Sequence, residues 1–142
     1  MLPRVDFYLL ADQRPNGRHL LACRLTEKAY GLGHTVYIHA ENAEEARRLD
    51  DLLWTFRDGS FVPHALYPAP ADDASPVLIG WNADSDASAD VLINLATDVP
   101  AFFERFDRIA ELVNQEPAVL QTSRQRFRLY RDSGISPETH KL

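Results

Sequence analysis

The sequence has almost none of the features that mark a secreted or membrane protein. Cys23 is the single cysteine in 142 residues, so the chain cannot form an internal disulfide, which fits a reducing compartment. No apolar run reaches the roughly 18 residues that a membrane-spanning helix needs. The amino-terminal residues show no basic leader followed by a small-residue cleavage site. We therefore expect a cytoplasmic protein with no membrane contact.

Positive charge is also scarce. The 15 lysines and arginines are outnumbered by 21 aspartates and glutamates, which gives a formal net charge of −6. This balance disfavours broad binding to duplex DNA, because such binding relies on many cationic contacts with phosphates. The charge is uneven, however. The last twenty residues have a net charge of +3, so the preceding 122 residues carry −9.

The signatures of common enzymes and metal sites are absent. Residues 11–21 contain one glycine and neither a phosphate loop nor a dinucleotide fingerprint. The five histidines lack metal-ligand spacing, and residues 84–90 lack the central glycine and final glutamate of a calcium loop. No serine has the setting of a hydrolase nucleophile. We expect no cofactor, no metal and no catalysis, with one alternative open: a nucleotide or phosphate-ester hydrolase whose site forms only in three dimensions.

What is present predicts one α/β domain over residues 1–142. Alternating strand and helix patterns at the amino end suggest parallel βαβ units, and four prolines exclude a regular helix over residues 57–76. We expect a three-layer sandwich around a mixed, mostly parallel sheet. The expected strands are 4–10, 34–40, 77–81 and 90–95, and the expected helices are 19–30, 43–54 and 117–132.

The segment that precedes the last helix leaves two alternatives. Apolar side chains at helical spacing favour a helix through residues 102–113. The stretch RIAELV, residues 108–113, also fits a strand that follows a short helix. The residues alone do not separate these two interpretations.

The last expected helix ends in RQRFRLYRDSG, residues 124–134, where most of the positive charge gathers. At 100° per residue, four side chains fall within an arc of about 100°. They are Arg124, Phe127, Arg128 and Arg131. Guanidinium groups bind carboxylates and phosphates through paired hydrogen bonds, and an aromatic ring adds an apolar wall. The pattern is typical of either a solvated helix face or a receptor for an anionic group.

The opposite side of the same helix is expected to face the core. It carries Val119, Leu129, Tyr130 and Ser133. Arg126 falls on this inner side too, so its guanidinium group must either extend to solvent or pair with a carboxylate.

A second cluster of large side chains surrounds the loop after residue 54. It contains Trp54, Phe61, Val62, Pro63 and His64. Such side chains form either a local core or a patch that a partner covers, because aromatic anchors carry much of the energy of protein interfaces. Pro63 fixes the backbone beside them, which lowers the entropy lost on binding.

Several of these stretches occur together in one family. The segments VDFYLL, RLDDLLWTF, SFVPH and the terminal RQRFRLYRDSG, in this order and over nearly the whole chain, resemble the chi subunit of bacterial DNA polymerase III. The resemblance implies a nucleotide-binding-like α/β topology without a phosphate loop. It implies a non-catalytic clamp-loader accessory that touches DNA only indirectly, although direct nucleic-acid binding through the same arginines is an alternative. It also favours a strand for residues 108–113.

The resemblance implies two partners. One is the acidic carboxyl-terminal tail of single-stranded DNA-binding protein, which ends in an apolar residue that bears the terminal carboxylate. Arg124, Phe127 and Arg128 match the tail-binding positions, with Arg131 beside them. Phe127 replaces the more usual tyrosine and Arg128 a lysine, so charge and aromatic bulk remain while a phenolic hydrogen bond is lost. The other partner is the psi subunit of the clamp loader. Trp54 and residues 61–64 (Phe61, Val62, Pro63, His64) are its expected contact surface.

Overall fold

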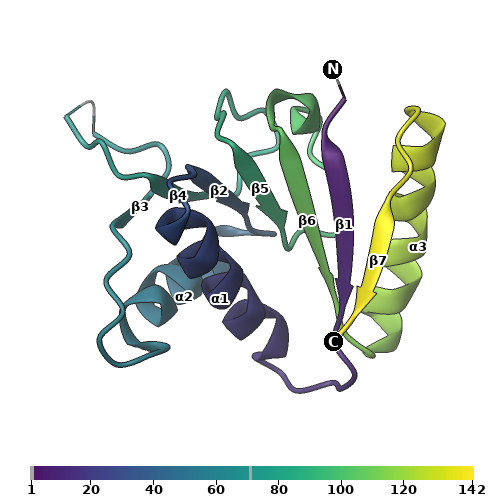
Figure 1. Cartoon of the computed structure of the whole chain (residues 1–142), viewed down its shortest axis with the longest axis horizontal. Helices are drawn as coiled ribbons and strands as arrows, with labels where there is room; N and C mark the ends of the chain where they lie inside the picture. The colour runs from purple at the N-terminus through teal and green to yellow at the C-terminus, as the bar shows by residue number, and fades with distance from the viewer. Residues whose placement is uncertain (1, 71) are drawn as a thin grey trace.

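The computed structural model describes residues 2–70 and 72–142 (Figure 1). Seven strands in these residues form one sheet in the order β3-β4-β2-β5-β6-β1-β7, and every neighbouring pair is parallel. The elements in chain order are β1 (Arg4–Leu9), α1 (Gly17–Gly31), β2 (Val36–His39), α2 (Ala43–Thr55), β3 (His64–Leu66), β4 (Val77–Gly80), β5 (Val91–Asn94), the 3-10 helix η1 (Phe103–Arg105), β6 (Arg108–Val113), α3 (Pro117–Asp132) and β7 (Glu138–Lys141).

The sheet lies between two helical layers. On one face, α1 and α2 cover a core that includes Ile38, Ile79 and Leu49. On the other face, α3 and η1 cover a second core that includes Tyr37, Leu92 and Tyr130. In Figure 1, α1 and α2 lie over the β2–β5 part of the sheet, whereas α3 runs beside β7 at the opposite edge. The expected three-layer α/β sandwich is confirmed.

Most expected elements form where the sequence placed them. Asn42 caps α2 by accepting a hydrogen bond from the Glu45 amide. Gly134 takes a φ of +90° just after α3, where a left-handed residue ends the helix. Residues 108–113 form strand β6, between β5 and β1. The strand interpretation of this segment is therefore confirmed.

Three details differ from the expectations. The sheet is wholly parallel rather than mixed, because the chain crosses over before each pairing. In addition, two short strands extend its edges. These are β3, within the proline-rich segment, and β7, whose polar residues are largely exposed. Leu129 does not pack inward; 41% of it is exposed, because the inner face of α3 is narrower than the arc expected from the sequence.

A buried carboxylate joins α3 to the sheet. Glu111 of β6 is 0% exposed, and its oxygens accept hydrogen bonds from Arg126 Nε (2.8 Å), Tyr130 Oη (2.7 Å) and Asn94 Nδ2 (2.9 Å). Of the two alternatives expected for Arg126, it therefore pairs with a carboxylate, that of Glu111. Burial and the charge of Glu111 raise the pKa of Tyr130 well above 10, so the phenol remains a hydrogen-bond donor.

Replacing Glu111 with alanine should destabilise the fold by about 3–5 kcal/mol, because it leaves the Arg126 guanidinium group buried without its counter-charge. Urea unfolding followed by circular dichroism measures this change. Glu104→Ala, at an exposed carboxylate of η1, is the control and should change the free energy of unfolding by less than about 0.5 kcal/mol. Equal stabilities for the two variants would contradict the role given to Glu111.

Candidate functional site

The arginine stripe of α3 lines an open hollow on the protein surface. Arg124, Phe127, Arg128 and Arg131, together with Asp132, surround a volume of about 500 Å³. The three arginines are exposed, while Phe127 is half-buried. All four side chains predicted from helical spacing therefore lie on one surface.

The three arginines of this hollow carry uncompensated charge. Across residues 2–70 and 72–142, no carboxylate lies within 4.0 Å of the guanidinium nitrogens of Arg124, Arg128 or Arg131. Arg126, on the inner side of the same helix, is paired with Glu111 at 2.8 Å. The outward guanidinium groups are therefore available to an anionic ligand, and Asp132 supplies the one negative charge beside them.

A second, more apolar hollow adjoins the first. It has a volume of about 200 Å³ and shares Arg124 and Phe127 with the charged hollow. Its other lining residues are Phe7 and Leu9 of β1, Ser123 of α3 and Thr139 of β7. The rings of Phe7 and Phe127 lie 5.3 Å apart between centroids, so Phe127 is held against β1 and forms the wall between the two hollows.

Sequence reasoning did not find the residues of this apolar hollow. Phe7 and Leu9 read as ordinary strand residues, and Thr139 lies in a strand that no apolar pattern indicated. They meet Phe127 only because β1 pairs with β7 beneath α3, with Phe7 opposite Thr139. The alternation in VDFYLL, which sends Phe7 and Leu9 to one face, was the available signal.

The second predicted surface divides into exposed and buried side chains. Trp54 is 55% exposed and Phe61 is 80% exposed, and Pro63 is exposed as well. Val62 and His64 are buried. His64 contacts the Trp54 ring, with centroids 4.3 Å apart, and its two ring nitrogens lie 2.7 Å from the Val62 carbonyl oxygen and 2.9 Å from that of Asp50. Val62 and His64 thus support the patch, and Trp54, Phe61 and Pro63 present it.

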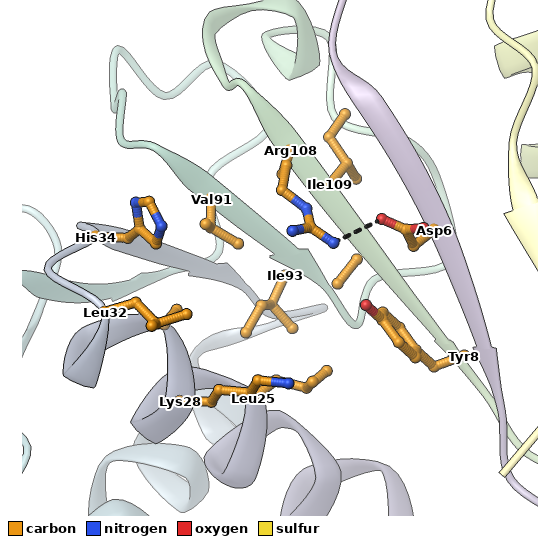
Figure 2. Close-up of a pocket in the computed structure, with 12 residues that line it drawn as sticks. Asp6, Tyr8, Leu25, Lys28, Leu32, His34, Val91, Ile93, Arg108 and Ile109 are labelled. Carbon is orange, nitrogen blue, oxygen red and sulfur yellow. Dashed lines mark hydrogen bonds and ion pairs between the residues drawn. The ribbon is translucent and has the colours of Figure 1, made fainter. Parts of the chain in front are cut away.

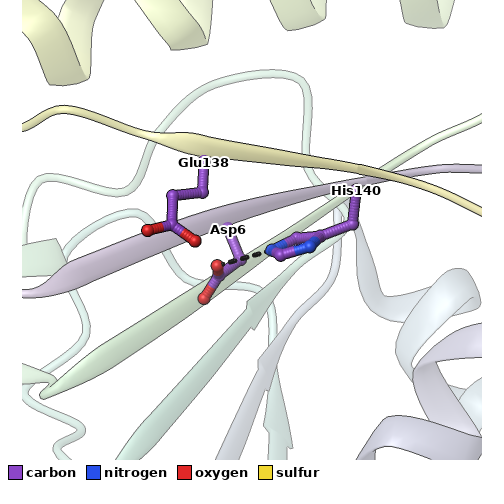
Figure 3. A group of neighbouring side chains, drawn as sticks. All are labelled: Asp6, Glu138 and His140. Atoms are coloured by element: carbon purple, nitrogen blue, oxygen red, sulfur yellow. Dashed lines mark hydrogen bonds and ion pairs between the residues drawn. The ribbon is translucent and has the colours of Figure 1, made fainter.

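A charged cluster that the sequence did not predict lies on the opposite face of β1 and β7 (Figure 3). Asp6 is almost fully buried and accepts a hydrogen bond from His140 Nε2 at 2.8 Å. Glu138 completes a trio whose ligand atoms lie within 4.8 Å of one another, close enough for a metal ion. However, Arg4 Nε and Arg108 Nη2 lie 3.3 and 3.2 Å from Asp6. These guanidinium groups already supply the positive charge, so the cluster is an ion-pair clasp between β1, β6 and β7.

Beside the clasp, a cleft of about 130 Å³ separates α1 from the uncovered part of the sheet (Figure 2). Tyr8 and Arg108 approach it from the sheet, and Leu25 and Lys28 from α1. Its lining is mostly aliphatic and includes one carboxylate, that of Asp6. The mixture does not define one class of ligand.

Residues 2–138 of this chain match the family model described as the DNA polymerase III chi subunit, HolC. The chain belongs to the chi subunit family. The DNA polymerase III subunit chi of Pseudomonas aeruginosa is 41% identical over 141 residues, covering 99% of this chain and 98% of that protein. The subunit of Escherichia coli K12 is 32% identical, with 97% of both chains covered. The chi family is part of the DNA polymerase III holoenzyme, so this protein is an accessory subunit of a replicative polymerase.

The fold of this chi family member also occurs outside polymerases. The C-terminal domain of the DEAD-box protein Dbp5 superposes with a TM-score of 0.63 over 99% of this chain and 90% of that one, at 14% identity. This likeness shows a shared α/β fold. As for membranes, none of the helices in the described part of the chain combines the length and apolarity that crossing a bilayer requires.

Because of the clasp, the free energy of unfolding should depend on pH in the acid range. Burial alone would raise the pKa of Asp6, but hydrogen bonds from His140 and Arg108 and the charge of Arg4 lower it below its usual value. Its stabilising contribution is therefore complete above the unfolded pKa of about 3.9 and is lost as pH falls through the lower folded value. The gap in free energy of unfolding between wild type and Asp6→Asn should shrink as pH falls from about 5 to about 2.

Denaturant unfolding at several pH values measures this gap. Asp107→Asn, at an exposed carboxylate beside β6, is the control and should show almost no gap at any pH. If the Asp6→Asn gap stayed constant down to about pH 2, ionised Asp6 would not be the source of the stability.

Proposed function

We propose that this protein is a non-catalytic connector in DNA replication. One surface binds the acidic carboxyl-terminal tail of single-stranded DNA-binding protein, and another binds the psi subunit of the clamp loader. The observation that carries the proposal is the hollow lined by Arg124, Phe127, Arg128 and Arg131, with its three arginines unpaired on an otherwise acidic protein. An acidic peptide end supplies the carboxylates that this surface lacks.

The two adjoining hollows suit the two parts of such a tail. The acidic residues would lie over Arg128 and Arg131, while the apolar terminal side chain would enter the hollow between Phe7, Leu9 and Phe127. Arg124 lines both hollows, so its guanidinium group is the natural partner of the terminal carboxylate. Phe127 serves through ring packing alone, since it has no hydroxyl group to donate.

Binding of this kind should be weak and sensitive to salt. Exposed ion pairs contribute roughly 0.2–1 kcal/mol each and are screened at physiological ionic strength. DNA coated with binding protein presents many tails together, however, and several weak contacts raise the apparent affinity without any new interaction. The negative charge of the rest of the chain would also keep it from competing for bare DNA.

The proposed psi surface lies at the far edge of the sheet. Trp54 contacts His64 of the edge strand β3, while the tail hollows border β7 at the other edge (Figure 1). Neighbouring strands are roughly 4.8 Å apart, so the two edges of a seven-stranded sheet are separated by about 29 Å. This separation supports the proposal, because both partners could bind at once without touching.

Arg128→Ala should weaken binding of a tail peptide roughly two- to fivefold at low salt, because one ion pair is lost. Isothermal titration calorimetry measures the affinity, and the difference from wild type should shrink as salt is added. Arg47→Ala, which removes an exposed arginine from α2, should bind the peptide as wild type does. Unchanged affinity in folded Arg128→Ala would remove Arg128 from the site. Equal binding of an acidic peptide and single-stranded DNA would favour a direct nucleic-acid binder.

Replacing both Trp54 and Phe61 with alanine should weaken psi binding by at least about thirtyfold, since truncating a central aromatic anchor costs roughly 2 kcal/mol or more. Calorimetry with purified psi gives the affinity. Leu32→Ala, at another strongly exposed apolar side chain, serves as the matched control. If the double variant kept the affinity of wild type, psi would bind elsewhere on the protein.

A further inference from the structure

The edge strand β7 has one side of its backbone free. Within residues 2–70 and 72–142, β7 pairs with β1 alone and is the last strand of the sheet. The Leu142 amide donates to the Leu9 carbonyl oxygen of β1 at 2.9 Å. Backbone groups point to alternate sides along a strand, so those of His140 also face β1, and the N–H and C=O groups of Thr139 and Lys141 point away from the sheet. Both residues are exposed, so another chain can reach these groups.

The opposite edge of the sheet is less open. Strand β3 has three residues, and none of them is exposed. Very short edge strands are one way in which proteins avoid pairing with other chains. In β7, by contrast, three of the four residues are exposed. An exposed edge of this kind can accept an extended peptide as an additional strand, whose main chain supplies the hydrogen bonds.

The apolar hollow lies between this free edge and α3. Thr139 lines it from β7, and Ser123, Arg124 and Phe127 line it from α3. The charged hollow continues from Arg124 along the same helix to Arg131, and α3 runs alongside β7 (Figure 1). Seven residues of helix span about 10.5 Å, the length of roughly three residues of extended chain. The two hollows together therefore suit a short extended segment that lies beside β7.

The two faces of such an added strand would meet different charges. Side chains on the α3 face would meet the guanidinium groups of Arg124, Arg128 and Arg131, which line the charged hollow. Side chains on the other face would lie on the side of Glu138, whose carboxylate is paired with Arg4 at 3.2 Å. Side chains of a strand alternate between its faces. Only every second acidic residue of an extended peptide would therefore gain an ion pair with α3.

The direction of α3 also sets the direction of the peptide. The helix runs opposite to β7 (Figure 1), so Arg131 lies toward the start of the strand and Arg124 toward its end. In the proposed function, the terminal carboxylate pairs with Arg124, and the preceding acidic residues lie over Arg128 and Arg131. A peptide placed in this way runs in the same direction as β7 and continues the wholly parallel sheet.

We propose that the acidic tail binds as an additional parallel strand on β7, between this edge and the arginine stripe of α3. Its apolar terminal side chain faces α3 in the hollow beside Phe127, so the residues two, four and six positions before the end face the arginines. In a parallel pair, the intervening residues direct their backbone groups at β7. The inference rests on the proposed function and adds to it the conformation of the tail and the positions whose side chains are recognised.

Two synthetic peptides of equal charge test this proposal by calorimetry with the full-length protein. Both have eight residues, carry three aspartates among serines, and end in leucine with a free carboxylate. Aspartates two, four and six positions before the end should give about fivefold tighter binding than aspartates one, three and five positions before it, because only the first set faces the arginines.

The outcomes separate this inference from the proposed function. Equal affinities, both weakened by Arg128→Ala, would overturn the added strand and leave tail binding at the arginines in place. No binding of either peptide would overturn both proposals. Tighter binding of the second peptide would place the terminal side chain away from α3, and would overturn the added strand as well.

Methylation of single peptide amides gives a control with unchanged side chains. In the tighter peptide, an N-methyl group three positions before the end should weaken binding about five- to tenfold, because it removes a hydrogen bond to β7. The same group four positions before the end should have little effect, because that amide points to solvent. Equal losses at the two positions would contradict strand addition.

Hydrogen exchange followed by NMR locates the added strand on the protein. Saturating peptide should slow exchange of the Thr139 and Lys141 amides and leave that of His140, which faces β1, unchanged. Unaltered exchange at Thr139 and Lys141 would overturn the proposal. Protection that appears without peptide and rises with protein concentration would mean that a second copy of the chain occupies the edge, which would overturn it too.

Discussion

The contact between Glu111 and Arg126 is the constraint on which the functional surface depends. One buried carboxylate of β6 receives donors from β5 and α3, and these hydrogen bonds hold α3 against β6 with one side of the helix facing the sheet. Because Arg126 points inward, Arg124 and Arg128, two positions away on either side, must point outward. The same buried pair thereby separates one structural arginine from the others, whose charge remains unpaired on the surface.

The arginine hollow and the exposed patch of Trp54, Phe61 and Pro63 lie near different edges of the sheet. The strand order puts β7 and the arginine hollow at one edge of the sheet, and β3 with Trp54 at the other. The central strands of this wholly parallel sheet are buried on both faces. A connector between two partners needs little more than this spacing and two surfaces of different chemistry.

The structural features that depend on local spacing could be predicted from the sequence. The 3.6-residue period of α3 is enough to put Arg124, Phe127, Arg128 and Arg131 on one surface, and Asn42 is recognisable as a helix cap from its neighbours. Features made by distant segments were not accessible. In the sequence, Glu111 is one polar residue in an apolar strand, and no neighbouring residue indicates that it pairs with Arg126. Strands β3 and β7 are too short or too polar to show a period, so the apolar hollow beside Phe127 and the Asp6 clasp were both missed.

Leu129 and the proposed psi surface show where sequence patterns placed residues wrongly. Helical spacing placed Leu129 inside, but only a narrow strip of α3 touches the sheet. The segment from Phe61 to His64 was predicted as one surface, whereas the chain alternates there, burying Val62 and His64 beneath Trp54 and its neighbours. Side chains alternate in direction along an extended segment, and this alternation could have indicated which residues are buried and which are exposed.

We propose that one small domain holds two partners at opposite edges of its sheet. Calorimetric titration of the tail peptide into the preformed complex with psi tests it most directly. We expect the same affinity and stoichiometry as for the protein alone, because the two proposed surfaces are independent. Loss of peptide binding in the presence of psi would mean that the partners compete, and would contradict the connector role.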